Sequence, residues 1–390
     1  MLYLDYAATT PPYDEVVDAV AEVMKQHYGN PSSLHRLGVV AEQLVSQARA
    51  VIASSMSCQP EEIRFTSGGT ESNNWAIQAT ARRFRHRGNH LITTAVEHAS
   101  VYETFRELER QGFRVTYLPV DATGAVKLDE LDKALSDDTI LVSIMAVNNE
   151  MGRIQPISAI GELLRQRSRT IVFHVDAVQA IGKLPLHPGK LKIDLLSCSA
   201  HKLRGPKGSG FLYVRKGLEL PPLLYGGGQE GGLRSGTENV PSLVGMAKAI
   251  RMAVEEQERF HAHTHLLRKQ LAAAIRDIPE LRLSGSDMES EMAPHIVHFC
   301  FPGMKSEVLV HALEEADIYV SSRSACSSSA NKPSRVLKAM GFDDARAISG
   351  IRISYSLSQT IDDINYFGEQ LQKAVERLKH TITGQPNRRR

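Results

Sequence analysis

The chain has 390 residues, of which 42% are hydrophobic and 23% are charged, values that are ordinary for a globular protein of two or three domains. Its formal net charge is +2, so we expect neither nucleic acid nor a membrane as a partner. The four cysteines are widely spaced, with no CxxC and no His/Cys pair at zinc spacing. This spacing argues against a disulfide framework or a metal site and favours a reducing, cytoplasmic location. The first residues lack the pattern of a secretion signal, and no apolar run approaches the length needed to span a bilayer.

Short apolar runs alternate with longer amphipathic segments over most of the first 250 residues. The runs predict strands at Ile63–Phe65, Leu91–Thr93, Val115–Leu118, Ile140–Val142, Ile171–Phe173, Leu195–Ser197 and Phe211–Val214. The segments predict helices at Asp14–Gln26, Val39–Ser54, Glu71–Phe84, Ser100–Gln111, Leu128–Leu135 and Pro156–Gln166. Such alternation predicts an α/β fold with a mostly parallel seven-stranded sheet between layers of helices, and ligands bind beyond the carboxyl ends of such strands.

The pattern changes after about residue 242. A long charged helical pattern, Leu243–Asp277, is predicted to connect the large domain to a smaller α/β domain. The elements expected in the smaller domain are a strand at Ile296–Cys300, a helix near Glu307–Glu315, a strand at Ile318–Val320 and a helix near Ile361–Leu378. We expect a large domain over 14–250, a small domain formed by 1–13 with 251–380, and a basic tail over 381–390.

The segment Phe65–Asn74 (FTSGGTESNN) places two glycines between a predicted strand and a predicted helix. Free backbone N–H groups and the helix dipole at such a point favour an anion, and glycine lets a phosphate approach the backbone. A glycine turn followed by a threonine N-cap is also a common structural device, so this motif alone leaves both interpretations open.

Two further segments follow predicted strands. In Ser199–Gly210 (SAHKLRGPKGSG), Lys202 could form a Schiff base with a carbonyl cofactor, although a basic surface loop is the alternative. In His174–Gln179 (HVDAVQ), Asp176 could hold a protonated pyridine nitrogen, or could cap the next helix.

A fourth segment, Ser321–Ala330, surrounds Cys326 with small and polar residues. Because it has little to bury, we expect a mobile loop whose cysteine is exposed and reactive. Cys198 and Cys300 lie instead within apolar strand patterns and are interpreted as packed structural thiols.

Together these four segments resemble the cysteine desulfurases, the NifS/IscS-like members of the class V aminotransferase family of fold-type I pyridoxal-phosphate enzymes. The resemblance covers nearly the whole chain and is carried by an ordered set of motifs that is specific as a set. Its further members are Tyr3–Pro11, Tyr28–Ser33, Val96–His98, Val147–Gly152, Gly226–Gln229, Arg234–Thr237 and Gly350–Ser354.

The resemblance implies roles for the residues that match the motifs. Lys202 resembles the lysine that binds the cofactor, pyridoxal 5'-phosphate, covalently. His98 resembles the residue that stacks on the pyridine ring and shuttles protons, Asp176 the partner of the ring nitrogen, and Gln179 the donor to the ring oxygen. The remaining positions that match cofactor contacts are Gly69, Thr70, Asn149, Ser199, His201 and Thr237.

Four of the matching residues imply a substrate, a nucleophile and an assembly. Asn149 and Arg352 resemble the residues that hold the substrate amino acid, with Arg352 taking the carboxylate in a bidentate fork. Cys326 resembles the nucleophile that forms a persulfide. Thr237 matches a position donated across a subunit interface, which implies a homodimer.

The implied function is that of a cysteine desulfurase. The enzyme would remove sulfur from L-cysteine, giving L-alanine and a persulfide on Cys326, and would pass the sulfur to an acceptor such as an iron–sulfur scaffold or a tRNA-thiolation enzyme. The sequence departs from the family pattern at Arg323, which stands where a glycine is usual before the nucleophile. The serine-rich surroundings of Cys326 differ from the Arg-x-Gly-His-His-Cys form of the selenocysteine-lyase-like branch, which favours cysteine as the substrate.

Two alternatives remain open. A pyridoxal-phosphate-dependent aminotransferase of the same fold would share Lys202 and Asp176 but would have no need for Cys326 on a mobile loop. A sulfur-relay protein without catalysis would purify without the yellow absorbance of the cofactor.

Overall fold

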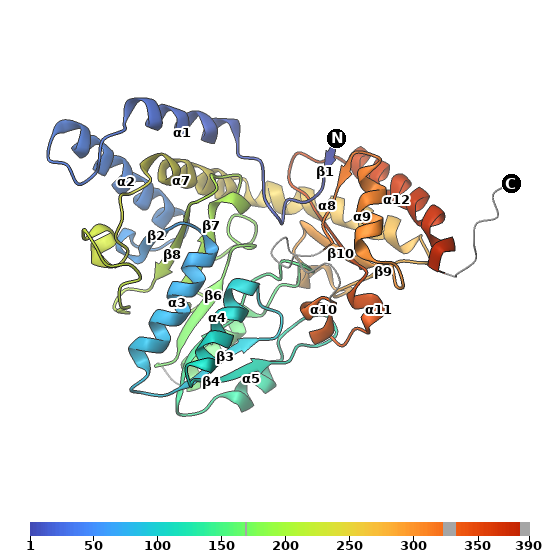
Figure 1. Cartoon of the computed structure of the whole chain (residues 1–390), viewed down its shortest axis with the longest axis horizontal. Helices are drawn as coiled ribbons and strands as arrows, with labels where there is room; N and C mark the ends of the chain where they lie inside the picture. Colours follow the sequence, from blue (N-terminus) through green and yellow to red (C-terminus); the bar gives the residue numbers. More distant parts are fainter. Residues whose placement is uncertain (168–169, 323–332, 383–390) are drawn as a thin grey trace.

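The computed structural model describes residues 1–167, 170–322 and 333–382. Within them, a seven-stranded sheet has the order β2-β8-β7-β6-β5-β3-β4 (Figure 1). Its strands are β2 (Ile63–Thr66), β3 (His90–Thr94), β4 (Arg114–Leu118), β5 (Thr139–Ser143), β6 (Val172–Asp176), β7 (Leu195–Ser199) and β8 (Gly210–Val214). The strands from β7 to β4 run parallel, whereas β8 is antiparallel to both of its neighbours. All seven predicted strands are confirmed, with ends that differ by no more than three residues.

Helices cover both faces of this sheet. Consecutive strand residues point to opposite faces, and in β3 Leu91 packs into one apolar cluster whereas Ile92 packs into another. Leu141 and Val142 divide in the same way in β5. The first cluster is closed by helices α3 (Gly69–Phe84) and α4 (Ala99–Arg110), and the second by α2 (Arg36–Ser55), α6 (Ile157–Arg167) and α7 (Val240–Glu255). The predicted α/β sandwich is therefore confirmed, with α1 (Asp14–Gln26) and α5 (Leu128–Ala134) also close to their predicted bounds.

A second group of elements packs around its own apolar cluster. It contains a three-stranded antiparallel sheet of β9, β10 and β12, and a parallel pair of β1 and β11. Its elements are β1 (Leu2–Tyr3), α8 (Gln257–Arg276), β9 (Arg282–Leu283), β10 (Ile296–Cys300), α9 (Ser306–Glu314), β11 (Ile318–Tyr319), β12 (Gly350–Ser354) and α12 (Ile361–Ile382). Helices α10 (Arg335–Ala339) and α11 (Asp344–Ala347) lie in the same stretch of the chain but pack into the cluster that α2, α6 and α7 close. Figure 1 shows β9, β10, α9 and α12 at the opposite end of the molecule from α1 and α2. The domain bounds given above stay a prediction.

One predicted element is wrong. The pattern over Leu243–Asp277 predicts one long connecting helix, but the chain forms two helices, α7 and α8, that meet at Glu256. Glu256 leaves helical geometry at φ −90° and ψ 0°, and its carboxylate accepts a hydrogen bond from Tyr13 Oη at 3.1 Å. No glycine or proline stands near this break, so periodicity alone gave no signal of it. In the described part of the chain, the helices are all too short or too polar to cross a membrane.

Candidate active site

A cavity of about 410 Å³ opens beyond the carboxyl ends of β5, β6 and β7, where the sheet topology predicts a ligand site. Ten of the predicted site residues line it: Gly69, Thr70, His98, Asn149, Asp176, Gln179, Ser199, His201, Lys202 and Arg352. Thr237 instead lines a neighbouring cavity of about 220 Å³. Cys326 falls in 323–332, outside the described residues, as does Arg323.

Asp176 ends β6 and is only 5% exposed. Its Oδ2 accepts a hydrogen bond from Asn73 Nδ2 at 2.8 Å, and its Oδ1 accepts one from the backbone N–H of Val178 at 3.0 Å. A turn follows Asp176 and not a helix, so the helix-cap interpretation of this residue is wrong. One carboxylate oxygen stabilises the turn while the side chain lines the cavity.

Asn73 also lines the cavity. It lies inside the Phe65–Asn74 motif, but no role was predicted for it from the sequence. From the first turns of α3 it donates to Asp176 and also to Ser100 Oγ at 2.9 Å. Ser100 Oγ lies 2.8 Å from His98 Nδ1, so a continuous network joins the carboxylate to the imidazole. The spacing of one helical turn from Gly69 was the available signal.

His98 precedes α4 and acts as its N-cap. Its Nδ1 accepts from the backbone N–H of Ser100 at 3.2 Å, so the neutral ring carries its proton on Nε2. Burial lowers the pKa of His98; Asp176 opposes that shift, and Lys202 and Arg335 add to it. The ring is therefore held neutral near pH 7, and it lines the cavity.

The glycine turn brings the backbone close to β8. Gly68 has φ +152°, and a Cβ on Gly210 would lie 2.5 Å from the Cys198 carbonyl oxygen and 2.6 Å from Gly68 Cα. Only glycine fits at position 210 without moving backbone. Gly68 also gives no side-chain cap to the sixteen-residue helix α3, so the first N–H groups of the helix face the cavity without a cap from that residue. This is the anion-binding arrangement of a helix N-terminus.

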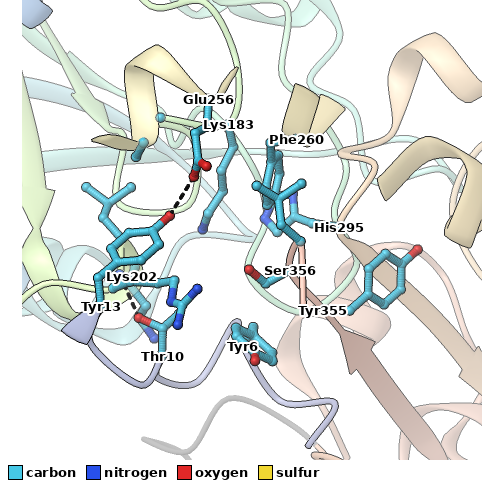
Figure 2. A pocket seen from close by; sticks show the side chains of 15 residues that line it. Tyr6, Thr10, Tyr13, Lys183, Lys202, Glu256, Phe260, His295, Tyr355 and Ser356 are labelled. Carbon is cyan, nitrogen blue, oxygen red and sulfur yellow. Dashed lines mark hydrogen bonds between the residues drawn. The ribbon is translucent and has the colours of Figure 1, made fainter. Parts of the chain in front are cut away.

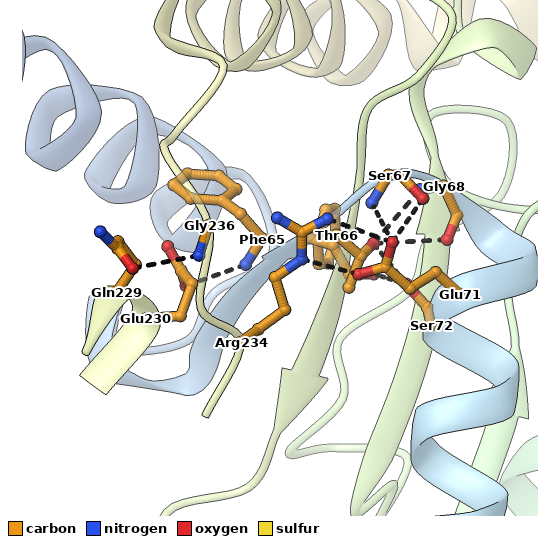
Figure 3. A network of polar contacts seen from close by, with 11 residues as sticks. Phe65, Thr66, Ser67, Gly68, Glu71, Ser72, Gln229, Glu230, Arg234 and Gly236 are labelled. Carbon is orange, nitrogen blue, oxygen red and sulfur yellow. Dashed lines mark hydrogen bonds and ion pairs between the residues drawn. The ribbon is translucent and has the colours of Figure 1, made fainter. Parts of the chain in front are cut away.

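Ion pairs fix this turn to a distant loop (Figure 3). Glu71 accepts from the N–H of Ser67 at 3.1 Å and from Arg234 Nε at 2.9 Å. Glu230 pairs with Arg49 through both carboxylate oxygens, at 2.7 and 2.8 Å, and accepts from the backbone N–H of Phe65 at 3.0 Å. The loop that carries Thr237 is thereby held beside the start of α3.

Lys202 lies in the 3-10 turn after β7. Its Nζ donates to the carbonyl oxygens of Ala7 and Ala8 at 2.6 and 2.5 Å. Burial lowers the pKa of the neighbouring His201 to about 4, with Lys202 and Lys207 adding to the shift, so that imidazole is neutral at pH 7. Lys207 also lines the cavity and was not singled out by the sequence analysis. The basic-surface-loop interpretation of this segment is wrong for Lys202, which lines the cavity.

Arg352 enters the cavity from β12 and is 1% exposed. Its Nη1 donates to the Asn149 carbonyl oxygen at 2.7 Å, and its Nη2 pairs with Asp5 Oδ1 at 2.8 Å. Nε of Arg352 is buried without a partner among the described residues. Asp5 was not predicted, because it lies 347 positions away along the chain and its motif gave no hint of a partner.

Both flanks of the segment 323–332 are bonded to residues around this cavity. On one side, Ser321 Oγ donates to Asp5 Oδ2 at 2.9 Å. On the other side, Ser334 Oγ donates to Glu150 Oε2 at 2.7 Å, and Arg335 donates to the carbonyl oxygens of Ala95 and Glu97. The residues that flank Cys326 in sequence therefore start and end beside the site.

The three cysteines in the described part of the chain are poor candidates for a nucleophile. Cys198 and Cys300 are fully buried, and burial raises the pKa of both thiols. Burial also raises the pKa of the half-buried Cys58 to about 12. All three stay protonated at neutral pH, which agrees with the structural role predicted for Cys198 and Cys300.

The residues of this cavity fit pyridoxal phosphate. An amine (Lys202), a carboxylate (Asp176) and a neutral imidazole (His98) line one cavity with an uncapped helix N-terminus. The glycines at 68 and 69 keep side chains away from that N-terminus, as a phosphate requires. A carboxylate for the ring nitrogen and backbone donors for the phosphate are the groups that this cofactor demands.

Comparisons with known proteins agree with this arrangement. A model of the aminotransferase class-V family matches residues 2–367. Relatives named cysteine desulfurase IscS come from Methanosarcina thermophila, 44% identical over 379 residues, and from Neisseria meningitidis serogroup C, 45% identical over 381 residues; each comparison covers 97% of this chain and 93% of the relative.

Solved structures are similar over the same length. A structure described as a NifS-like protein superposes with a TM-score of 0.91 at 39% identity, covering 97% of this chain and all of that one. A second, described as SspA in complex with cysteine, superposes with a TM-score of 0.79 at 35% identity, covering 92% of this chain and all of that one. The chain therefore belongs to the class V aminotransferase family, among its NifS/IscS-like cysteine desulfurases.

Proposed function

We propose that this protein is a pyridoxal-phosphate-dependent cysteine desulfurase that transfers the sulfur of L-cysteine to Cys326 and releases L-alanine. The observation that carries the proposal is one cavity lined by Lys202, Asp176 and Arg352. A lysine and a carboxylate suit the cofactor, and a buried guanidinium suits the carboxylate of an amino acid. The near-complete coverage of relatives named cysteine desulfurase supports the same activity.

The protein would hold the cofactor both at its pyridine ring and at its phosphate. Lys202 Nζ would bind it covalently, Asp176 would pair with its ring nitrogen, and His98 would pack on its ring, with Gln179 near the ring oxygen. The phosphate would be bound by the start of α3 together with Gly69, Thr70, Ser199 and His201. When bound, the cofactor supplies an electron sink for negative charge that develops on the substrate.

The substrate would be oriented by Arg352 and Asn149. Arg352 binds the α-carboxylate through two N–H groups, while its other contact with the Asn149 carbonyl oxygen keeps the guanidinium plane fixed. The amine of Lys202 moves the proton of the α-carbon, and burial keeps His98 neutral beside it.

The sulfur step follows from the chemistry of a thiolate. Cys326 attacks the sulfur of the bound cysteine; an S–S bond forms as the bond between Cβ and sulfur breaks. The electron pair from the broken bond goes to Cβ, which takes up a proton and leaves as the methyl group of alanine. The bonds of Ser321 and Ser334 to residues around the cavity support this role, since both flank the segment that carries Cys326.

The test is release of sulfide and alanine from cysteine under a reductant. Cys326→Ala should retain the bound cofactor and its absorbance and lose sulfide production by at least about a hundredfold, because no other described thiol ionises readily. Cys58→Ala is the matched control and should retain activity.

Other outcomes would contradict the proposal. Full turnover by Cys326→Ala would exclude that residue as the nucleophile. A keto acid formed from cysteine without sulfide would favour an aminotransferase of this fold, and purified protein that never binds the cofactor would favour a non-catalytic sulfur relay.

The assembly and the sulfur acceptor belong to the same proposal. We infer a homodimer, in which Thr237 would reach the phosphate of the partner's cofactor, because Thr237 lies outside the main cavity of its own chain. The acceptor would be an iron–sulfur scaffold or a tRNA-thiolation enzyme in the cytoplasm, and a pull-down with the persulfidated enzyme would identify it.

A further inference from the structure

A second, smaller cavity shares Lys202 with the main cavity. We call it the Lys183 cavity; its volume is about 40 Å³ (Figure 2). It is lined by Tyr6, Thr10, Tyr13, Gly182, Lys183, Lys202, Leu203, Arg204, Ala253, Glu256, Phe260, His295, Tyr355, Ser356 and Leu357. These residues come from the N-terminal segment, the turn after β6, the 3-10 turn after β7, the break between α7 and α8, and the ends of β10 and β12. None of the roles proposed above uses this cavity.

Lys183 places a buried amino group in this space. It is 7% exposed, and among the described residues its Nζ has one side-chain hydrogen bond, a long one of 3.4 Å to Gln179 Oε1. Burial lowers the pKa of Lys183 to about 7, with Lys202 adding to the shift. A buried cation without a carboxylate partner is costly, so the ammonium form needs a counter-charge that the described side chains do not supply.

His295 presents a second unsatisfied group to the same space. It is 1% exposed, and both of its ring nitrogens are buried without a hydrogen-bond partner among the described residues. A neutral imidazole always carries one N–H donor and a protonated one carries two, so at least one buried donor is left over. The Phe260 ring packs against it at 5.6 Å between centroids. Figure 2 shows the Lys183 side chain reaching into the space between Tyr13 and His295.

The balance of charge around the cavity is positive. Among the described residues, Lys183 and Arg204 line it besides Lys202, which would carry the cofactor, and Glu256 is the one acidic lining residue. That carboxylate already accepts from Tyr13 Oη at 3.1 Å and lies 3.5 Å from Arg259. A water molecule could accept from the unsatisfied donors but would leave the charge uncompensated.

We propose that the Lys183 cavity binds one small monovalent inorganic anion, of the size of chloride or bromide, between Lys183 Nζ and the His295 ring. The volume is enough for about three atoms of the size of a water oxygen and excludes an amino acid or a phosphate ester. The anion accepts hydrogen bonds from the ammonium and the imidazole N–H, and it neutralises the Lys183 cation.

Bromide is the probe, because it scatters X-rays anomalously and can be located directly. Crystals of the holoenzyme grown in sodium gluconate and soaked in sodium bromide should show an anomalous peak between Lys183 and His295. Crystals of Lys183→Met should lack that peak. Density for water alone in the wild-type cavity, with no anomalous signal, would overturn the proposal.

A solution measurement complements the crystals. The thermal unfolding midpoint of the holoenzyme is followed as gluconate is replaced by bromide at constant ionic strength. The wild type should show a saturable rise, and the half-saturating bromide concentration should increase by about tenfold or more in Lys183→Met. Lys190→Met, at an exposed lysine of the same segment, is the matched control and should respond as the wild type does.

Two further variants cover the case in which Lys183→Met fails to fold. Lys183→Arg retains the charge and should keep a saturable response. His295→Phe removes both ring nitrogens and should weaken the response. An unchanged bromide response in Lys183→Met or in His295→Phe would refute the assignment of the site.

Discussion

Glu97 is buried immediately before His98 and accepts hydrogen bonds from Thr94 Oγ1 at 2.8 Å and from the backbone N–H of Met145 at 3.0 Å. Burial raises the pKa of Glu97 to about 8, against the opposing effect of these two bonds. Its second carboxyl oxygen has no partner among the described residues. The site therefore contains a carboxyl group that is mostly neutral at pH 7, close to Asp176.

This carboxyl group should make stability depend on pH. In the unfolded chain Glu97 ionises near pH 4.5, so the folded state binds the proton more tightly. The free energy of unfolding therefore falls as the pH rises from about 4.5 to about 8, because over this range the unfolded chain releases the proton that the folded chain keeps. Glu97→Gln keeps the shape and never ionises. Relative to wild type, its free energy of unfolding should rise over that interval by at most about 5 kcal/mol. Urea unfolding at pH 5, 6.5 and 8 measures this, with Glu107→Gln at an exposed position of α4 as the control. A difference that is independent of pH would contradict the prediction.

Asp5 gives Arg352 a resident counter-ion in the absence of substrate. In Asp5→Asn the guanidinium, 1% exposed, loses that charge, and the free energy of unfolding should fall by about 1–3 kcal/mol. A bound carboxylate should then stabilise the variant more than the wild type, because it supplies the counter-charge that Arg352 has lost. L-alanine should therefore raise the thermal unfolding midpoint of Asp5→Asn further than that of the wild type. Asp317→Asn, at an exposed position near β11, is the control. Equal shifts in variant and wild type would show that Asp5 does not compensate Arg352.

At the scale of elements, the contact between β8 and the turn before α3 sets the shape of the anion-binding end of the site. Gly210→Ala would place a methyl group 2.5 Å from the Cys198 carbonyl oxygen, and no flexible side chain is there to yield. The variant should lose about 1–3 kcal/mol of stability and bind pyridoxal phosphate more weakly. Gly189→Ala, where nothing lies within 4 Å, should be close to neutral. Thermal unfolding and cofactor titration check both; a neutral Gly210→Ala would contradict the close approach.

Elements differ in how far their sequence determines them. Strands such as β5 and β7 were predictable because parallel strands buried on both faces read as continuous apolar runs. The break at Glu256 was not predictable, since no glycine or proline marks it and its contact is with Tyr13, 243 positions away along the chain. Asp176 and Lys202 were found because each follows a strand inside a recognisable motif. Asp5 and Asn73 were missed because their importance comes from partners that only the folded chain brings near.

At the scale of the whole molecule, several large apolar side chains remain exposed on a single chain. Leu34, between α1 and α2, is 98% exposed, and Tyr225, in the segment that leads to Thr237, is 85% exposed. Because single exposed apolar side chains are normal on a monomer, substitution of these two is needed to test whether the inferred dimer covers them. We expect light scattering to give twice the 43.0 kDa of one chain. Leu34→Asp with Tyr225→Asp should shift the protein toward monomer and weaken cofactor binding, whereas Leu266→Asp on α8 should not; a monomeric wild type would contradict the inferred assembly.

The first eight residues join the two ends of the molecule. β1 pairs with β11, Leu4 is fully buried, and the carbonyl oxygens of Ala7 and Ala8 accept from Lys202. An affinity tag fused directly before Leu2 would therefore disturb β1, which is followed within a few residues by the contacts to Lys202. Removal of the first eight residues would delete the two carbonyl oxygens that accept hydrogen bonds from Lys202 Nζ. Purification tags and reporter fusions for this enzyme belong after α12.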